Sequence, residues 1–288
     1  MRISKTPAVL LTALACATLT LPAQWPDYPT SGPRTKEGKI DLAAPPPRTA
    51  DGKSDFSGLW EPARGPGGRG GQSMNGTLPL PFAIPSSPDD PPVPQFFNIG
   101  AGFKDGFLPF TPWAKEIRAE RKGNDNKDNP DALCLPLGLT QLLMHPQPRK
   151  IFQTPRGIVV LYEANGDVRQ ILTDGRPLPN NDPEPWWYGY SVGHWDGDTL
   201  VVETAGFRDD VWLDVQGSPL TSSGTMTERW RRVKYGLMQI DITIEDPKAY
   251  TKPFTVRVNH QLMPDTELME FVCQERDAVH YVGKPAGK

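Results

Sequence analysis

The sequence is poor in the residues that most often carry metal or thiol chemistry. It has 3 cysteines and 4 histidines among 288 residues. The histidines are His145, His194, His260 and His280. No two of them have the HExxH spacing, and no pair of cysteines has the CxxC spacing, that holds a zinc ion. We therefore expect neither a metal site nor a cofactor.

Long runs of one residue type are also scarce. Lys and Arg are scattered and the formal net charge is −3, which argues against a nucleic-acid partner. The apolar run at residues 8–21 is too short to span a bilayer, and no later run is longer. It follows Arg2 and Lys5 and ends in small residues, as a secretory signal does. We expect cleavage near Ala23, no membrane insertion, and a periplasmic or secreted mature protein.

Two cysteines remain beyond this signal, Cys134 and Cys273. An even pair in an oxidising compartment usually forms a disulfide. The sequence therefore predicts a Cys134–Cys273 bond. The alternative is two separate buried thiols that act as small apolar residues.

Proline is frequent, with 33 residues, and it is concentrated before residue 150. Stretches such as 45–47 and 85–94 cannot form central strands or helix interiors, because proline lacks an amide hydrogen and fixes φ. We therefore expect an extended arm at residues 24–55. One β-rich domain, residues 56–288, follows and begins with a loop-rich part at 61–148.

One short helix is expected in this first half, over residues 112–122. Thr111 is a suitable N-cap and Pro112 fits the first turn. Trp113 and Ile117 then lie on one face.

Short β-rich runs follow residue 149, separated by turn residues: 151–154, 158–163, 168–173, 191–195, 199–204, 238–244, 254–262 and 269–273. The later runs alternate apolar and polar residues, which is typical of strands with one buried face. Short connections without helices predict an antiparallel meander. We expect it to close into a barrel, since closure hides the edge strands; a sandwich is the alternative.

Nine segments together resemble an uncharacterised family of exported bacterial proteins. They are 47–60 (PRTADGKSDFSGLW), 110–121 (FTPWAKEIRAER), 134–136 (CLP), 151–155 (IFQTP), 168–177 (VRQILTDGRP), 189–204 (GYSVGHWDGDTLVVET), 227–232 (TERWRR), 246–256 (DPKAYTKPFTV) and 267–283 (ELMEFVCQERDAVHYVG). The segment at 189–204 is the most specific. Members often carry PHSxAL before the TERxRR strand, whereas residues 219–224 here are PLTSSG, so no role for that histidine is carried over. The later hairpins are also similar to lipocalin barrels, which implies a central cavity.

Three residues are candidates for catalysis. Ser191 lies in a G-x-S-x-G match, but the nucleophile elbow needs a strand that turns into a helix, and a hairpin follows here. His260 is in phase with the apolar positions of its strand, so it is either a hydrogen-bonded core residue or a polar group in a cavity. His194 is the other candidate acid or base, each histidine requiring a carboxylate partner.

Four aromatic residues follow a loop rich in proline and asparagine: Trp186, Trp187, Tyr188 and Tyr190. They either close one end of the core or line a binding site and stack on a flat ligand. Polar strand faces carry Arg229, Arg231 and Arg257. We expect these to pair across strands with Asp241, Glu245 or Glu228.

These observations favour a β-barrel that binds a small, partly apolar molecule. One alternative is a cofactor-independent hydrolase, lyase or isomerase that uses His260 or His194. A structural or interaction protein is the other. The binder predicts an apolar pocket with few charges, whereas the enzyme predicts converging histidine and carboxylate groups with shifted pKa values.

Overall fold

The computed structural model describes residues 28–63, 83–103, 108–179 and 184–273. The expected signal peptide lies outside these ranges. None of the helices within them is long and apolar enough to cross a membrane.

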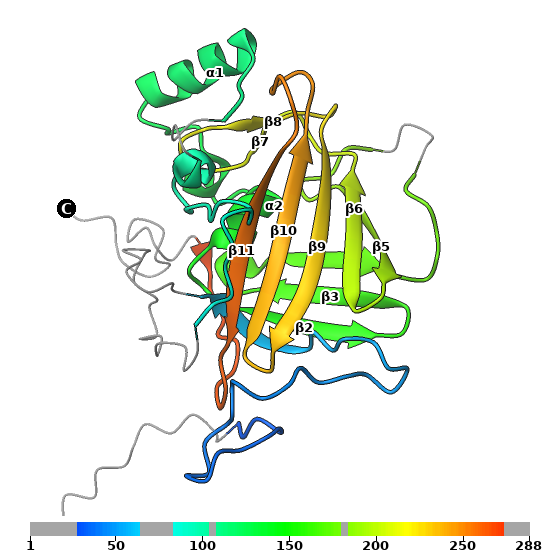
Figure 1. Cartoon of the computed structure of the whole chain (residues 1–288). Coiled ribbons are helices and arrows are strands. Elements are labelled where there is room, and N and C mark those ends of the chain that lie inside the picture. Colours follow the sequence, from blue (N-terminus) through cyan, green and yellow to red (C-terminus); the bar gives the residue numbers. More distant parts are fainter. Residues whose placement is uncertain (1–27, 64–82, 104–107, 180–183, 274–288) are drawn as a thin grey trace, which may run out of the picture.

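In the described part of the chain, nine strands close into one barrel (Figure 1). They are β1 (Gly58–Pro62), β2 (Arg149–Thr154), β3 (Gly157–Tyr162), β4 (Val168–Leu172), β5 (Tyr190–Asp196), β6 (Thr199–Ala205), β9 (Thr225–Lys234), β10 (Leu237–Glu245) and β11 (Phe254–Leu262). Two short strands, β7 (Val211–Trp212) and β8 (Pro219–Leu220), pair with each other. The predicted closed β-barrel is confirmed.

The helical elements are α1 (Pro112–Gly123), α2 (Leu139–Met144) and the 3-10 turns η1 (Ile99–Gly102), η2 (Pro130–Leu133) and η3 (Ala164–Gly166). α1 begins where predicted, because the Thr111 hydroxyl accepts a hydrogen bond from the Ala114 amide at 3.2 Å. α1 and the β7–β8 pair lie at the upper end of the barrel in Figure 1. α2 was not predicted. All its residues are buried, so it has no polar face to give a helical pattern.

The predicted hairpins are present because their turns contain residues that tolerate positive φ. Asn165 and Gly166, between β3 and β4, have φ values of 55° and 65°, and Gly197, between β5 and β6, has 59°. β10 and β11 pair along their length, with Ile240 opposite Val258. Their alternating apolar residues therefore face the barrel interior, as predicted.

The barrel closes in a way that a simple meander does not. β4 and β5 run parallel, with Ile171 opposite Ser191. β1 lies between β11 and β2. The expected strand at 269–273 was wrong, because β1 already occupies the edge of β11 that a further strand would need. Among the described residues, no strand follows β11.

The predicted disulfide is present. Cys134 and Cys273 are bonded, with their Cα atoms 5.6 Å apart. Cys134 directly follows η2. The bond therefore ties the loop-rich first half to the segment that follows β11.

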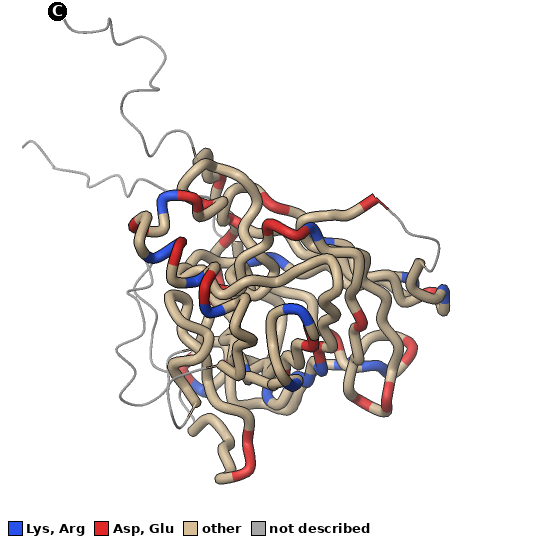
Figure 2. Tube along the Cα trace, turned by 90° about the horizontal axis from the view of Figure 1, so that it is seen from above, with Lys and Arg blue, Asp and Glu red and all other residues tan. Residues whose placement is uncertain are grey.

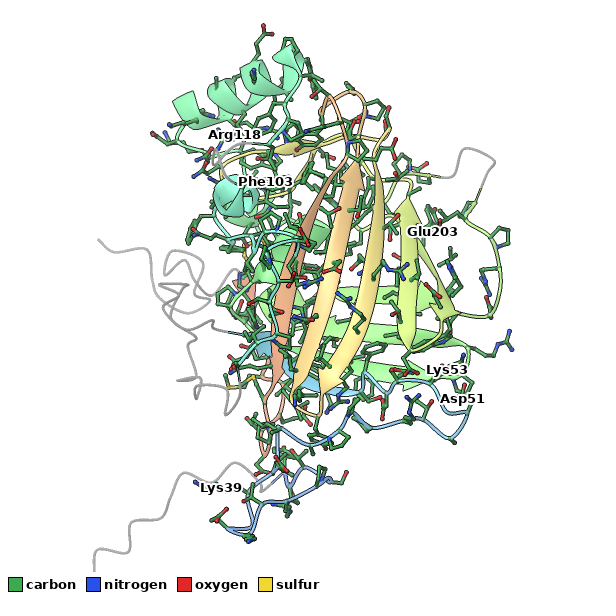
Figure 3. The ribbon with its side chains drawn as sticks, viewed as in Figure 1. Lys39, Asp51, Lys53, Phe103, Arg118 and Glu203 are labelled. Atoms are coloured by element: carbon green, nitrogen blue, oxygen red, sulfur yellow. A yellow bond between two sulfur atoms is a disulfide. The ribbon has the colours of Figure 1, made fainter. Side chains whose placement is uncertain are left out.

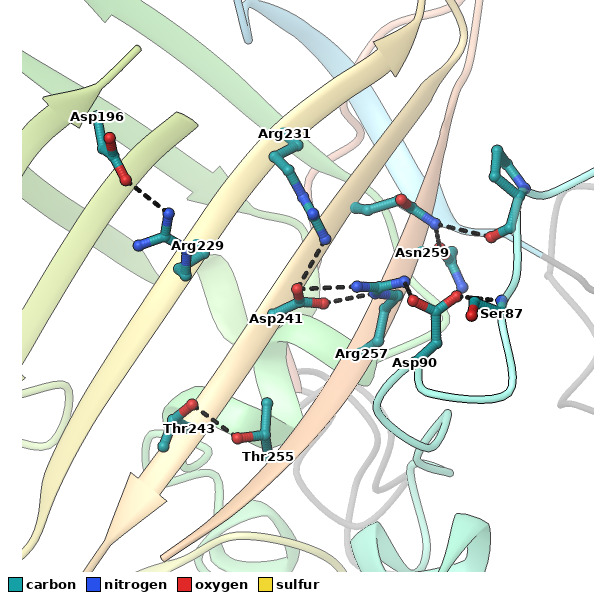
Figure 4. Close-up of polar contacts among 12 residues, drawn as sticks. Ser87, Asp90, Asp196, Arg229, Arg231, Asp241, Thr243, Thr255, Arg257 and Asn259 are labelled. Carbon is teal, nitrogen blue, oxygen red and sulfur yellow. Dashed lines mark hydrogen bonds and ion pairs between the residues drawn. The ribbon is translucent and has the colours of Figure 1, made fainter. Parts of the chain in front are cut away.

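A proline-rich segment covers the part of β11 that β1 leaves unpaired (Figure 4). The Arg257 amide donates to the Pro92 carbonyl at 2.9 Å. The Arg257 guanidinium contacts Asp90 and Asp241, both at 2.5 Å, and Arg231 also binds Asp241 at 2.7 Å. The cross-strand pairing expected of Arg231 and Arg257 with Asp241 is thus present, and it also anchors this covering segment.

Side chains fill the barrel interior. Trp60 and Trp230 are fully buried there, together with Phe56, which lies two residues before β1. Phe56 stacks on Trp195 with ring centres 5.9 Å apart and meets Trp230 edge-on at 5.8 Å. Charged residues of both signs are interspersed along the trace (Figure 2).

Candidate functional site

His260 faces the barrel interior and is fully buried, as its phase on β11 predicted. Its Nε2 lies 2.8 Å from an Arg149 Nη atom and 2.8 Å from the Leu143 carbonyl. The same Arg149 nitrogen donates to that carbonyl at 2.7 Å. We therefore assign Nε2 as the acceptor from Arg149, with the proton on Nδ1.

Burial, with the Arg149 charge adding to it, lowers the pKa of His260 well below 6.5. Arg149 also donates to the carbonyls of His145 and Gln147, at 2.7 and 3.2 Å, so it holds the end of α2 against β2. Burial lowers the pKa of Arg149 to about 10. With Nε2 as the acceptor from Arg149, its approach to the Leu143 carbonyl is a contact and not a hydrogen bond. Among the described residues, a guanidinium and a carbonyl lie against the imidazole, and no carboxylate does. These contacts are those of a core histidine.

A second buried polar group lies between β4 and β9. Arg169 forms a two-point ion pair with Glu228, and both side chains are at most 1% exposed. Arg169 also donates to the hydroxyls of Ser191 and Thr204 at 3.1 and 3.2 Å. Glu228, which we expected on the polar outer face, points inwards instead. It shares the phase of the buried Trp230, whose indole donates to it at 3.2 Å.

Ser191 and His194 are not brought together. Ser191 faces the interior, where its hydroxyl contacts Arg169 and Thr204. His194 points to the opposite face of β5 and is exposed, as the alternation of a strand requires. The strand then turns into β6, not into a helix. This arrangement supplies no base next to the Ser191 hydroxyl.

The four predicted aromatic residues divide between two environments: Trp187 and Tyr188 pack against the hydrophobic core, whereas Trp186 is exposed and Tyr190 is half-buried. Trp186 is 51% exposed and stacks on Tyr190 with ring centres 4.1 Å apart. The central carbon of the Arg208 guanidinium lies 4.6 Å from the centre of the Trp187 ring. The Tyr188 hydroxyl interacts with Asp167, whose pKa burial raises to about 6.

Tyr190 also lines a small cleft of about 200 Å³ on the outer side of the barrel. The other walls are apolar or small, formed by Pro179, Pro185, Ala205, Gly206, Phe207 and Ser222. This cleft and the Trp186 ring are candidates for a minor contact site.

The larger cleft lies between the arm and residues on or next to strands β2 to β5. Figure 1 shows the arm passing beneath these strands at the lower end of the barrel. Its volume is about 340 Å³, within the range of small-molecule sites. Twelve residues line it: Thr49, Ala50, Asp51, Lys53, Asp55, Ser57, Gln153, Thr154, Pro155, Ile158, Thr173 and Trp195. We call this cleft the barrel mouth.

Hydrogen bonds fix the arm in place as one wall of the barrel mouth. Gln153 accepts from the Phe56 amide at 2.8 Å and donates to the Ser54 carbonyl at 2.9 Å. Arg48 binds Asp198 of the β5–β6 turn through two contacts of 2.7 Å. The wall is therefore tied both to β2 and to the β5–β6 turn.

The barrel mouth combines an aromatic surface with polar groups. The Trp195 ring rests on Phe56, and the Lys53 ammonium lies 5.7 Å from the Trp195 ring centre. The Asp55 carboxylate accepts a hydrogen bond from the Ser57 amide at 2.8 Å. Figure 3 shows Lys53 and Asp51 on the arm below the barrel.

No family model, curated protein or solved structure matches this chain. The described residues contain no group of three His, Cys, Asp or Glu side chains placed to hold a metal ion.

Sequence reasoning did not find the barrel mouth. All its residues except Ile158 come from four of the segments that carry the family resemblance, 47–60, 151–155, 168–177 and 189–204. These segments are far apart in the chain, and only barrel closure brings them together. One signal was available: Trp195 is in phase with the inward-facing Ser191.

Proposed function

We propose that this barrel binds a small, partly apolar molecule at the barrel mouth, as an exported protein of the family it resembles. The observation that carries the proposal is a cleft of about 340 Å³ whose floor joins the Trp195–Phe56 ring stack to several polar groups. Binding sites for small molecules typically combine a largely apolar surface with a few fixed polar atoms. Because side chains occupy the barrel interior, we place the ligand at the end of the barrel and not at its centre.

The enzyme alternative has less support. It requires a carboxylate next to His260 or His194, yet the His260 ring accepts from Arg149 and otherwise lies against the Leu143 carbonyl. His194 projects from the outer face of β5. In a purely structural protein the barrel mouth would hold no ligand. The following experiment distinguishes that role from binding.

The test uses the exported full-length protein and mass spectrometry of small molecules that co-purify with it. Trp195→Leu removes the aromatic surface of the barrel mouth. Trp186→Leu is the matched control, because Trp186 stacks on Tyr190 of the outer cleft. We expect a ligand to co-purify with the wild type and with Trp186→Leu but not with Trp195→Leu.

Circular dichroism and urea unfolding establish that both variants are folded. Loss of the ligand from Trp186→Leu alone would move the site to the outer cleft and refute the assignment. A wild-type protein that carries no ligand, and whose unfolding midpoint no member of a metabolite library raises, would favour a structural role.

A further inference from the structure

We propose that the ligand of the barrel mouth is an amphipathic organic anion: a small carboxylate whose apolar part packs on Trp195 and whose charge meets Lys53. This inference rests on the proposed binding function and adds the chemical class of the ligand.

The barrel mouth leaves a set of hydrogen-bond donors available to a ligand. Four half-buried side chains, those of Lys53, Ser57, Thr173 and Trp195, line the cleft. Among the described residues, no hydrogen bond or ion pair occupies the Lys53 ammonium, the two hydroxyls or the Trp195 indole N–H. Each of these groups can donate a hydrogen bond. A set of donors around one cleft is complementary to a ligand rich in acceptors, and a carboxylate is acceptor-only.

The acidic side chains of the barrel mouth do not neutralise Lys53. The acids Asp51 and Asp55 also line the cleft. Asp55 lies beside Arg232, a buried guanidinium that it helps to keep charged. Asp51 is exposed and accepts from the Thr49 hydroxyl at 2.5 Å. The Lys53 ammonium is half-buried and forms no ion pair among the described residues. One acid that its charge reaches, Asp198, is already paired with Arg48.

The neighbouring rim adds positive charge. Arg156 and Arg176 share one partner, Asp174, at 3.7 and 2.6 Å. Arg48 is matched by Asp198. Two guanidinium groups on one carboxylate leave a net positive charge beside Thr173, which would attract an anion over roughly one Debye length, about 10 Å at 0.1 M salt.

The barrel mouth also offers an apolar surface to a ligand. Trp195, Ile158, Pro155 and Ala50 line the same cleft as Lys53. The Trp195 ring is held in place by its stack on the fully buried Phe56. An apolar ligand group can therefore bury against a preorganised surface while its carboxylate stays at the rim, which lowers the entropic cost of binding.

The experiment compares acids with their uncharged counterparts. Isothermal titration calorimetry at pH 7 measures binding of benzoate, hexanoate and 3-phenylpropanoate, and of the three matching primary amides, to the exported full-length protein. The same titrations use Lys53→Met, Lys53→Arg and the control Lys252→Met, an exposed lysine in the β10–β11 turn at the opposite end of the barrel. Before titration, bound ligand is removed by partial unfolding in urea and refolding with the disulfide intact.

We expect at least one acid to bind at least tenfold more tightly than its amide, because a charge-assisted hydrogen bond to Lys53 contributes about that factor. Lys53→Met should remove this preference, whereas Lys53→Arg and Lys252→Met should retain it. Raising the salt concentration should weaken binding of the acid and leave the amide unchanged. A preference that survives Lys53→Met would overturn the role of Lys53.

The outcomes separate this inference from the proposed function. Equal binding of acids and amides that Trp195→Leu abolishes would refute the anion and keep the binding site. If no acid binds with a dissociation constant below about 1 mM while a neutral ligand co-purifies, the ligand class is wrong and the function stands. Failure of every compound, with no co-purified ligand, contradicts both.

Discussion

Glu228→Gln tests whether the barrel interior is as dry as its packing indicates. The substitution keeps the size of the side chain but removes the charge that faces Arg169, and both side chains are at most 1% exposed. The Arg169 guanidinium would retain its contacts with Ser191 and Thr204. Those neutral hydroxyls cannot replace a carboxylate. Breaking one partner of a buried ion pair typically costs about 3–5 kcal/mol, a large part of the total stability of a domain.

The same strand supplies the control. Arg229, the next residue along β9, points outwards and binds Asp196 at 2.7 Å. These side chains are 47% and 62% exposed. Arg229→Gln should therefore cost about 0–1 kcal/mol, less at high salt because water and ions screen the pair. Two ion pairs on one strand thus differ mainly in burial.

Urea unfolding at low and high salt measures both free energies, with tryptophan fluorescence and circular dichroism as probes and with the disulfide kept intact. The cost of Glu228→Gln should not depend on salt. The double variant Arg169→Met with Glu228→Met should recover part of the loss, since it leaves no unpaired buried charge. A cost of Glu228→Gln as small as that of Arg229→Gln would show that water reaches the interior, and the argument for a packed barrel would fail.

Three further perturbations test other parts of the structure. Because the pKa of His260 is lowered in the folded protein, the unfolded chain takes up a proton first as the pH falls, and the wild-type stability should decline below about pH 6.5. His260→Gln should reduce the slope of stability against pH by up to about 1.4 kcal/mol per pH unit. Parallel stability curves for the wild type and the variant, measured by urea unfolding at several pH values, would refute this. Asp167, with its pKa raised to about 6, opposes folding when ionised, so Asp167→Asn should stabilise the protein by about 1 kcal/mol at pH 7, allowing for its partial exposure. That gain should vanish near pH 4, and a gain that persists there would point to another cause. Replacing Cys134 and Cys273 by serine opens a loop with a sequence separation of 139 residues and should cost about 4–5 kcal/mol in the chain-entropy model; an unchanged unfolding midpoint would contradict this.

The hairpins could be predicted from sequence because their information is local. A turn dipeptide such as Asn165-Gly166 permits the positive φ values that a tight connection needs. The alternation in β10 and β11 then fixes which side chains face inwards. This is why the phase of His260 predicted its burial correctly.

Closure of the barrel depends on contacts between distant residues, which local patterns do not encode. The place of β1 between β11 and β2 joins strands separated by most of the chain. The parallel pairing of β4 with β5 follows a connection, residues 173–189, that is too long for a hairpin turn, and no local pattern shows which strand β5 joins. Glu228 was assigned to the wrong face because a charged residue is rarely buried without a partner, and its partner Arg169 lies 59 residues away.

The site was harder to predict than the fold for the same reason. Conspicuous aromatic residues such as Trp186 lie close together in sequence, yet the structure divides them between the hydrophobic core and the surface. The barrel mouth takes Lys53 from the arm and Trp195 from a hairpin, and neither residue stands out in its own segment. Their proximity depends on the arm crossing the end of the closed barrel.

Phe56 links the packing of the interior to the location of the site. A lipocalin-like barrel with an open centre would place a ligand among its inward-facing side chains, but here Phe56 enters from the arm and contacts both Trp195 and Trp230. Beyond Trp230, on the side away from the barrel mouth, Arg169, Glu228, Ser191 and Thr204 form a buried hydrogen-bonded cluster. A ligand in the centre would have to displace both the ring and a hydrogen-bonded ion pair, whereas a ligand at the barrel mouth would leave both in place and could bind Lys53 directly. The same packing that fills the barrel therefore favours binding at its end.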